Sequence, residues 1–443
     1  MLRRYSWSLR SLVGLALVAS VAVVGCGDDD DDSGAAGSPG VSPLCEGVTA
    51  PCVAFATGTT EQDISEAIVS ATAGTTFVFG EGTFTFTNTL SVGTANVTVR
   101  GQGMDRTVLD FKGQVAGAEG LNVQDVAGFT IEDIHVRDTK GDGVKVTGGN
   151  GVTFRRLRVE FTAADATSRG AYGIYPVQCD NVLIENCEAI GASDSGIYVG
   201  QSRTIIVRNN TARGNVAGIE IENCYNADVT ENTATENVGG ILVFDLPALQ
   251  QLGGHDVRVF KNQIFGNNTA NFAPQGNIVG SVPAGTGVLV MANRNVEIFD
   301  NDIKDNNTAA LAVASYAVSL RPIEDPNYYQ WPRQVYVHDN RFSGNGKSPD
   351  AKTAIGGILA KEFPSPAVVP ELLIDGNKDK TATSDYPGNP QVICFKNNSG
   401  DGADQKAAFS DLAYPDFGDK KSSDITPFTC ELPPVAAVVL PSR

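Results

Sequence analysis

Histidine is scarce in this sequence, which contains only 3 among its 443 residues. His135, His255 and His338 lie far apart in the chain and show none of the spacings that zinc sites use. We therefore assign no metal-binding role to any of them.

Basic residues are also few, because 33 lysines and arginines stand against 51 aspartates and glutamates, for a net charge of -18. The lysines and arginines form no stripe along the chain. A protein of this charge is repelled by phosphate backbones, so we exclude a general role in nucleic-acid binding or at an anionic membrane surface.

Long apolar runs are lacking as well. The run from Leu12 to Val24 is too short to cross a bilayer as a mature helix. Arginines precede it, which is the charge order of a secretory signal peptide. The small residue before Cys26 resembles the lipobox of bacterial lipoproteins, and this resemblance implies cleavage there and a lipid on the Cys26 thiol.

These features define the expected N-terminal organisation. We predict a lipoprotein signal peptide over residues 1–25, and a lipidated cysteine with a flexible acidic tether over residues 26–41. The protein is then expected in the cell envelope, held on a membrane through its lipid. By resemblance to other lipoproteins, this is the outer membrane.

The rest of the chain is dominated by a short repeat that leaves no room for a helix in each unit. The stretch from Gly196 to Asn237 contains almost two copies of one 22-residue unit. In several units, the glycine that opens the first strand lies 14 residues before the same position of the second strand. Examples are Gly196 with Asn210 and Gly218 with Asn232. A repeat of short strands and turns at this period is typical of a β-solenoid.

Asparagines recur at two positions of the unit. In a solenoid, each recurring position stacks above itself at about 4.8 Å, so the side-chain amides are expected to form hydrogen-bonded ladders. The two columns are Asn210, Asn232, Asn262, Asn301 and Asn340, and Asn215, Asn237, Asn267, Asn306 and Asn345.

The sequence predicts an all-β fold, a right-handed parallel β-helix of roughly eleven to twelve coils. A helical pattern over 62–71, with Asp63 and Glu66 as a capping box, is expected to form a short helix that caps the open N-terminal coil. We place the β-helix domain at residues 42–380. Residues 381–443, where the repeat fades, form a capping segment over the other end.

Several segments of this domain, taken in order, carry a resemblance to a known fold. The short helix, Gly80–Phe84, Val97–Gly103 and the asparagine-rich coils together resemble right-handed β-helices of the pectin-lyase-like type. Residues 60–380 resemble a family of exported bacterial β-helix repeat proteins, which are often lipoproteins. The resemblance implies the fold and, as a tendency of the class, carbohydrate binding or processing. The Asp-Pro-His triplet of mannuronan epimerases is absent, which disfavours that chemistry.

Insertions into the repeat predict where a site lies. They precede the glycine-opened strands at 161–170, 268–285 and 346–355, and follow them at 246–255, 316–333 and 362–370. The outer face of those strands is therefore expected to be the floor of a groove. Its outward columns are Lys145, Tyr175, Tyr198, Glu220, Leu242, Leu289, Ala312 and Leu359, and Thr147, Val177, Gly200, Glu222, Phe244, Met291, Ala314 and Lys361.

The first half of this floor is polar and aromatic, which suits a sugar chain. Tyr175 and Tyr198 offer flat faces to pyranose rings, and Glu220 and Glu222 can bond hydroxyl groups. Further candidates for substrate binding are Tyr172, Asp165, Arg169, Phe244 and Asp245. The alternative is a tyrosine stack that packs under the 161–170 loop.

Glu220 and Glu222 are also the candidate catalytic pair, because their Cα atoms are expected about 6.8 Å apart on one strand. If the protein is an enzyme, it is a polysaccharide lyase, an epimerase or a glycoside hydrolase. The alternative is that both are solvated strand acids. Lys145 lies about 14 Å from Glu220 in a regular solenoid, which argues against a shared Lys–Glu site. No cofactor is expected, although Glu220, Glu222 and Asp245 could bind Ca²⁺ without a recognisable loop motif.

The second half of the floor is apolar. Leu242, Phe244, Leu289 and Met291 are expected to need a cover, either the 268–285 and 316–333 loops or a partner protein. The first function class is therefore an envelope-anchored protein that binds or processes an extended polysaccharide in the groove. The second is a non-enzymatic scaffold that docks a protein through this apolar strip. In either case we expect a monomer.

The 8 cysteines suit an exported protein. Beyond Cys26, we expect disulfides between Cys45 and Cys52 and between Cys394 and Cys430, which lie outside the regular repeats. Cys179 and Cys224 lie two coils apart, too far to be bridged.

The predicted anchor can be tested by Cys26→Ser, which removes the thiol that would carry the lipid. In a bacterial host, the wild-type chain should incorporate a labelled fatty acid and remain in the membrane fraction. The variant should incorporate none and leave that fraction, since one lost lipid removes most of the membrane affinity. Equal labelling of the two chains would contradict a lipid on Cys26.

Overall fold

The computed structural model describes residues 42–49, 51–401 and 403–441. The predicted signal peptide, Cys26 and the tether lie outside the described residues. Among the described residues, no helix is long and apolar enough to cross a membrane.

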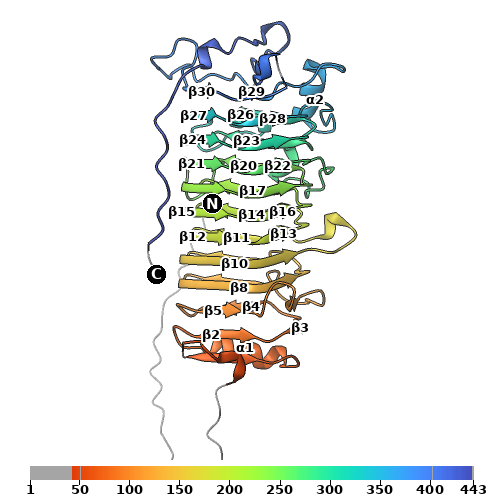
Figure 1. The fold of residues 1–443 in the computed structure, drawn as a ribbon, viewed down its shortest axis with the longest axis vertical. Helices are drawn as coiled ribbons and strands as arrows, with labels where there is room; N and C mark the ends of the chain where they lie inside the picture. Colours follow the sequence, from red (N-terminus) through yellow and green to blue (C-terminus); the bar gives the residue numbers. More distant parts are fainter. Residues whose placement is uncertain (1–41, 50, 402, 442–443) are drawn as a thin grey trace, which may run out of the picture. The chain divides into compact units, whose positions relative to one another are not determined.

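The described residues form a parallel β-helix whose coils contribute strands to three faces (Figure 1). Every pairing between the named strands is parallel, and each strand pairs with its counterpart in the next coil, as Tyr198 does with Glu220. Two faces belong to one 20-stranded sheet, because the long strands β8 and β10 run through both. The third is a separate 11-stranded sheet.

Face 1 is the ladder β1 (Cys52–Phe55), β2 (Thr76–Phe79), β5 (Thr98–Arg100), β8 (Ala127–Arg137), β10 (Asn150–Glu160), β12 (Asp180–Glu185), β15 (Arg203–Arg208), β18 (Tyr225–Thr230), β21 (His255–Phe260), β24 (Arg294–Phe299), β27 (Arg333–His338) and β30 (Ile393–Lys396). Face 2 is the ladder β3 (Gly82–Thr85), β6 (Thr107–Asp110), β8, β10, β13 (Glu188–Ile190), β16 (Thr211–Arg213), β19 (Thr233–Thr235), β22 (Gln263–Phe265), β25 (Asp302–Lys304) and β28 (Arg341–Ser343). Face 3 is the sheet β4 (Leu90–Val92), β7 (Leu121–Gln124), β9 (Val144–Thr147), β11 (Ile174–Val177), β14 (Ser195–Gly200), β17 (Ala217–Glu222), β20 (Gly239–Phe244), β23 (Thr286–Met291), β26 (Ala309–Ala314), β29 (Leu372–Ile374) and β31 (Phe409–Asp411).

The helices are few and lie outside the strand columns. The α-helices are α1 (Glu61–Val69) and α2 (Ala354–Glu362). The 3-10 helices are η1 (Pro43–Cys45), η2 (Ala166–Ser168), η3 (Ile278–Ser281), η4 (Tyr316–Ser319), η5 (Ala403–Gln405), η6 (Gly418–Lys420) and η7 (Thr426–Phe428).

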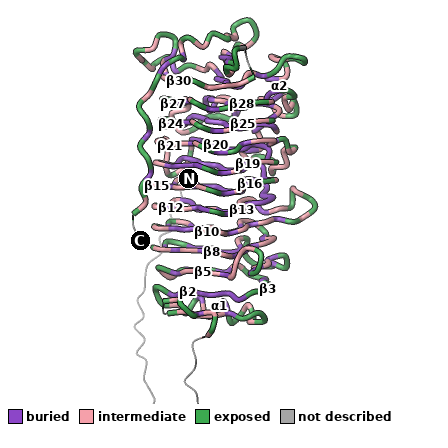
Figure 2. The backbone as a smooth tube through the Cα atoms, viewed as in Figure 1, coloured by how far each residue is buried: buried purple, intermediate pink, exposed green. Residues whose placement is uncertain are grey.

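Inward-pointing apolar residues fill the solenoid. Buried residues are concentrated in the strands, and exposed residues in the loops (Figure 2). Ile197, Ile219 and Ile241 occupy one column on face 3, and each is 0% exposed within one continuous core cluster. Burying such a side chain contributes about 1.5–3 kcal/mol. The alternation of the strands is therefore confirmed, with the second residue after each inward one facing inward again.

Both asparagine ladders are present as predicted. The backbone N–H and the side-chain amide of Asn210 donate to Oδ1 of Asn232, at 3.0 and 2.9 Å. Asn215 and Asn237 repeat this arrangement. The first ladder continues one coil further than predicted, because Oδ1 of Asn398 accepts from the backbone N–H of Asn340 at 3.1 Å.

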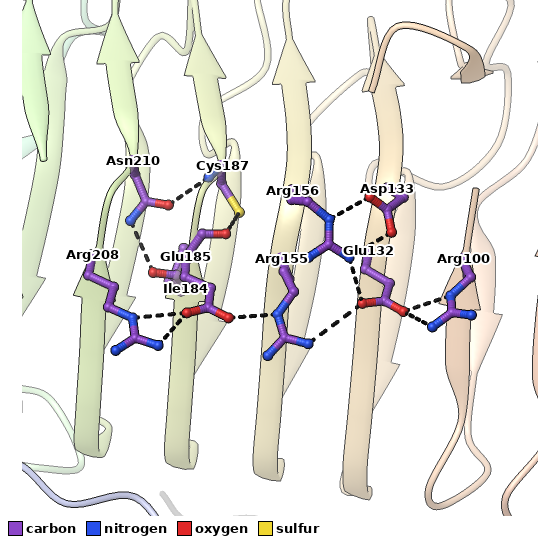
Figure 3. Close-up of polar contacts among 10 residues, drawn as sticks. All are labelled: Arg100, Glu132, Asp133, Arg155, Arg156, Ile184, Glu185, Cys187, Arg208 and Asn210. Atoms are coloured by element: carbon purple, nitrogen blue, oxygen red, sulfur yellow. Dashed lines mark hydrogen bonds and ion pairs between the residues drawn. The ribbon is translucent and has the colours of Figure 1, made fainter. Parts of the chain in front are cut away.

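A third ladder, which the sequence analysis missed, runs along face 1 and alternates in charge (Figure 3). Arg100, Glu132, Arg155, Glu185 and Arg208 occupy paired positions on β5, β8, β10, β12 and β15. Arg155 Nε donates to Glu185 at 2.6 Å, and Arg208 Nε donates to the same carboxylate at 2.9 Å. Opposite charges at neighbouring positions favour this register over a shifted one.

The N-terminal cap is confirmed, although its capping residue differs. Ile64 and Ile68 of α1 are buried in the core. The N-cap is Thr60, whose side chain accepts from the Asp63 backbone N–H at 3.2 Å, so Asp63 and Glu66 are not the capping box.

The C-terminal end differs from the prediction. Strand pairing continues past residue 380 through β30 and β31. The last residues do not cover the end of the solenoid but run back along face 1 (Figure 1). The backbone N–H of Val435 donates to Glu297 on β24 at 3.0 Å, and that of Val438 to Asp228 on β18 at 3.2 Å. Carboxylates on face 1 therefore bind this tail, which the repeat pattern does not reveal.

The predicted floor is also wrong in its last coil. Residues 354–362 form α2 rather than a strand, because Thr353 caps a helix whose Leu359 packs against an apolar cluster. Leu373 of β29 takes the position beside Ala312 that was expected for Leu359.

The disulfides Cys45–Cys52 and Cys394–Cys430 are both present, as expected from the sequence. Cys179, Cys187 and Cys224 are free and buried, so the prediction that Cys179 and Cys224 are not bridged is confirmed.

The asparagine ladder makes a stability prediction. Asn232→Ala should lower the free energy of unfolding by about 2–4 kcal/mol, because it leaves buried donors and acceptors of two neighbouring coils unpaired. Denaturant unfolding of the full-length chain measures this. The control is Asn327→Ala, an exposed site whose side chain makes no hydrogen bond within the described residues, where a change within about 0.5 kcal/mol is expected. Equal effects of the two variants would contradict a supporting role for the ladder.

Candidate functional site

The candidate site is formed by the outward residues in the first half of face 3, up to β17. Tyr175 pairs with Lys145 on the neighbouring strand, and Tyr198 pairs with Glu220. Tyr198 is 5% exposed, yet it lies outside the solenoid core that contains its neighbours Ile197 and Val199. The predicted columns are therefore real on this part of the face.

Three tyrosines pack together on this surface. The Tyr172 ring lies 4.5 Å from the Tyr175 ring and 4.8 Å from the Tyr198 ring, centroid to centroid. Tyr175 and Tyr198 meet edge to face at 4.9 Å. Since Tyr198 is covered by the other two, only Tyr172 and Tyr175 keep part of their rings accessible.

The two glutamates are buried, so the alternative that they are solvated strand acids is wrong. Glu220 is 1% exposed and Glu222 is 7% exposed. The Tyr198 hydroxyl donates to Glu222 at 2.6 Å, and the Ser195 hydroxyl bonds to Oε2 of Glu220. Glu220 Oε1 has no hydrogen-bond partner within the described residues.

Asp194 is a third acid in this cluster, which the sequence analysis missed. Its carboxylate accepts from the Ser195 hydroxyl at 3.0 Å and from the Asn277 side chain at 2.7 Å. A sequence signal was available, because the next two coils carry Val216 and Val238 at this position, so an aspartate there breaks the pattern.

Burial shifts the titration of all three acids upward. It raises the pKa of Asp194 to about 6 and that of Glu222 to about 7. Burial, reinforced by the charges of Glu222 and Asp194, raises the pKa of Glu220 well above its ordinary range. Because desolvation disfavours a carboxylate, burial favours the protonated form of Glu220.

The fold itself does not require these acids. In the following coils, the positions of Glu220 and Glu222 hold Leu242 and Phe244, which are 0% exposed. Buried titratable groups at positions where a solenoid accepts leucine and phenylalanine indicate a functional site.

Lys145 lies at the accessible edge of the cluster. Its ammonium is 4.8 Å from the centroid of the Tyr175 ring. It pairs with Asp142 at 3.3 Å and with Glu119 at 3.8 Å, two acids from the segments that precede β9 and β7. Burial raises the pKa of Asp142. The structure thus groups Lys145 with acids that the sequence analysis did not select.

Asp165, Arg169 and Asp245 form no described side-chain hydrogen bond with the acid cluster. Asp165 is exposed and caps η2 by accepting from the Thr167 backbone N–H at 3.0 Å, and Arg169 Nε donates to Ala163 O at 2.8 Å. The described hydrogen bonds of these two side chains therefore remain within the 161–170 loop, and the Arg169 carbonyl accepts from the Ser193 hydroxyl at 3.0 Å. Asp245 is 1% exposed and accepts from the Gly254 backbone N–H at 2.7 Å.

The apolar half of face 3 is covered by the chain's own loops. Leu242, Phe244, Leu289 and Met291 belong to a second apolar cluster with residues of two insertions. The 268–285 insertion contributes Val279 and Val282, and the 316–333 insertion contributes Tyr316 and Tyr328. This strip is therefore not available as a docking surface.

No calcium set is assembled by Glu220, Glu222 and Asp245. In the part of the chain that the structure describes, no group of three or more histidine, cysteine, aspartate or glutamate side chains is arranged to hold a metal ion.

Comparison with known proteins agrees with this architecture. The family model described as "Right handed beta helix region" matches residues 95–248. No curated protein matches the chain. The fold defines the class: this chain is an all-β protein built as a right-handed parallel β-helix.

Similar solved structures have low sequence identity. The A-module of a mannuronan C-5 epimerase from Azotobacter vinelandii is 16% identical, with a TM-score of 0.46 over 76% of this chain and 88% of that one. An alginate lyase from Paenibacillus is 13% identical, with a TM-score of 0.43 over 80% and 96%. An exopolygalacturonase from Thermotoga maritima is 13% identical, with a TM-score of 0.43 over 62% and 76%. The likeness concerns the fold alone.

The buried acids predict a pH dependence of stability. Glu222 has an ordinary pKa of 4.5 and a folded-state pKa of about 7, so between these values the folded chain holds a proton that the unfolded chain has lost. Stability therefore falls as the pH rises from about 4 through about 7. Glu222→Gln, which keeps an acceptor for Tyr198, should reduce the loss of stability between pH 5 and pH 8 by about 2 kcal/mol.

Denaturant unfolding of the full-length chain at the two pH values measures this difference. Glu231→Gln is the matched control, because Glu231 is exposed and its side chain forms no bond within the described residues. A Glu222→Gln variant with the same pH dependence as the wild type would show that Glu222 titrates normally.

Proposed function

We propose that this protein binds an extended polysaccharide on the first half of face 3. One observation carries the proposal: the covered half of the face is apolar, whereas the half that its loops leave accessible is polar and aromatic. The accessible surface consists of Asn122, Gln124, Lys145, Thr147 and Tyr175, which we call the polar floor.

The register of the strands arranges these groups in two columns. Asn122, Lys145 and Tyr175 lie side by side on β7, β9 and β11, and Gln124 lies beside Thr147. Neighbouring members are therefore about 4.8 Å apart along the solenoid axis. A repeated row of amide, hydroxyl and ammonium groups suits the repeated hydroxyl groups of an extended sugar chain.

The same site supports a second candidate function, which is the chemical processing of the bound polysaccharide. The carrying observation is the cluster of Asp194, Glu220 and Glu222, whose raised pKa values suit a general acid near neutral pH. The cluster meets the polar floor through Tyr198, which contacts Tyr175 and bonds to Glu222. Since both glutamates are buried, a sugar would reach them only after the side chains that cover them move aside.

The lipid on Cys26 complements this function. We propose that it holds the β-helix in the cell envelope, at the outer membrane, where it meets extracellular or envelope polysaccharides. The proposal rests on the sequence of residues 1–26.

Tyr175→Ala tests the polar floor. The full-length chain is titrated calorimetrically with pectin, alginate and envelope glycans, and each mixture is also assayed for new reducing or unsaturated ends. We expect one polysaccharide to bind, and the variant to bind it about 5- to 10-fold more weakly, because it loses the ring contact. New chain ends would establish processing as well as binding.

Phe260→Ala serves as the matched control, since Phe260 is a half-buried aromatic residue on face 1. It should bind as the wild type does. The proposal fails if no polysaccharide binds, or if Tyr175→Ala binds as tightly as the wild type.

A further inference from the structure

A second cleft lies apart from the polar floor. Its volume is about 910 Å³, within the range of sites that bind small ligands. Its walls come from residues 268–284 and 348–353, with Asn307, Ser319 and Arg321 between them. Both wall segments are insertions that the repeat does not need for stacking.

The walls of this cleft are held in place by their own hydrogen bonds. The Asn271 side-chain amide donates to Val279 O at 3.0 Å and to Val282 O at 2.9 Å, which closes the first wall on itself. The Asp350 carboxylate accepts from the Ala284 backbone N–H at 3.2 Å, which joins the two walls. The cleft is therefore formed before any ligand arrives, which lowers the cost of binding.

Arg321 links a third segment to the first wall. Its Nη2 donates to Gly276 O at 2.8 Å and to Asn277 O at 2.7 Å. No described residue forms an ion pair with this guanidinium. Its other N–H groups make no described hydrogen bond, so its positive charge and spare donors remain available in the cleft.

Other polar groups of the cleft are also without partners. Within the described residues, the side chains of Gln275, Asn307 and Lys352 form no hydrogen bond or ion pair. Asp350, the acid among the lining residues, uses its carboxylate oxygens on the backbone N–H groups of Ala284 and Lys352. The groups with hydrogen-bonding capacity to spare therefore include two carboxamides, the Lys352 ammonium and the remaining N–H groups of Arg321.

This set differs from the polar floor, where Lys145 is already paired with two acids. Neither Lys352 nor Arg321 forms an ion pair within the described residues, so both can attract an anionic ligand. Carboxamides both donate to and accept from hydroxyl groups, so they suit a sugar.

We propose that this cleft binds an acidic oligosaccharide, whose carboxylate or sulfate groups pair with Lys352 and Arg321 and whose hydroxyl groups bond to Gln275 and Asn307. The proposal goes beyond the function of the polar floor and shares no residue with it. The cleft does contact the buried acid cluster, because Asn277 in the cleft wall donates to Asp194.

Calorimetric titration of the full-length chain with three probes tests this proposal. The probes are a galacturonate oligomer, a sulfated oligosaccharide and a neutral glucose oligomer. At least one acidic probe should bind and the neutral one should not. Lys352→Glu should weaken the binding by about tenfold, the effect of losing one charged contact, and Gln275→Ala by about threefold. Raised salt should weaken the wild-type binding.

Lys261→Glu makes the same charge change at an exposed lysine that has no ion pair within the described residues, and it should bind as the wild type does. Lys352 is exposed and its side chain has no structural bond, so loss of folding is not expected to confuse the result. The proposal is overturned if neither acidic probe binds, if the neutral probe binds equally well, or if Lys352→Glu binds as the wild type does. Binding lost in Tyr175→Ala but kept in Lys352→Glu belongs to the polar floor and also overturns it.

Discussion

The stacking of each coil on the next in strict register is the constraint on which the rest of this structure depends. The asparagine ladders enforce it from inside, because each amide bonds both to the coil before it and to the coil after it. The Arg100 to Arg208 ladder favours the same register from outside, through alternating charge. Once the register holds, a position in the repeat becomes a continuous column on a surface, so a change of residue type along the column changes the surface locally.

Face 3 shows the consequence of this geometry. Along one column, Tyr198 and Glu220 are followed by Leu242 and Leu289, with no change in the backbone. The apolar members are covered by insertions and become a second core, which is stabilising. The acidic members are buried too, and burial of a carboxyl group is unfavourable unless it is protonated or hydrogen-bonded. Acids at positions where the next coil holds leucine and phenylalanine are not needed for packing, so they indicate a chemical role rather than a structural one.

The insertions have two different uses in this molecule. Some side chains, such as Val279 and Tyr328, close over the apolar strip and so complete the packing. The outward side of the same 268–285 insertion, at Gln275, forms a polar cleft with the 348–353 segment. One insertion can therefore cover a core and present a binding wall, because its two sides face different surroundings. The C-terminal tail likewise covers part of face 1, where Glu297 and Asp228 accept hydrogen bonds from its backbone.

The sequence alone determined whatever repeats: the parallel coils, the inward isoleucines, the asparagine ladders and the columns of face 3 as far as Ala312. Periodicity carries this information, because equivalent positions must stack. It also identified Tyr172, Tyr175, Tyr198, Glu220 and Glu222 as neighbours. Only the tertiary structure decided what the non-repeating segments do: that residues 354–362 form a helix, that the tail returns along face 1, and that Asp194, Asn277 and Lys145 join the acids and tyrosines. Those contacts link residues up to 210 positions apart, as Val438 and Asp228 show, and no local pattern encodes them. The burial of Glu220 and Glu222 was also decided only by the tertiary structure, since it depends on which side chains and loops cover them.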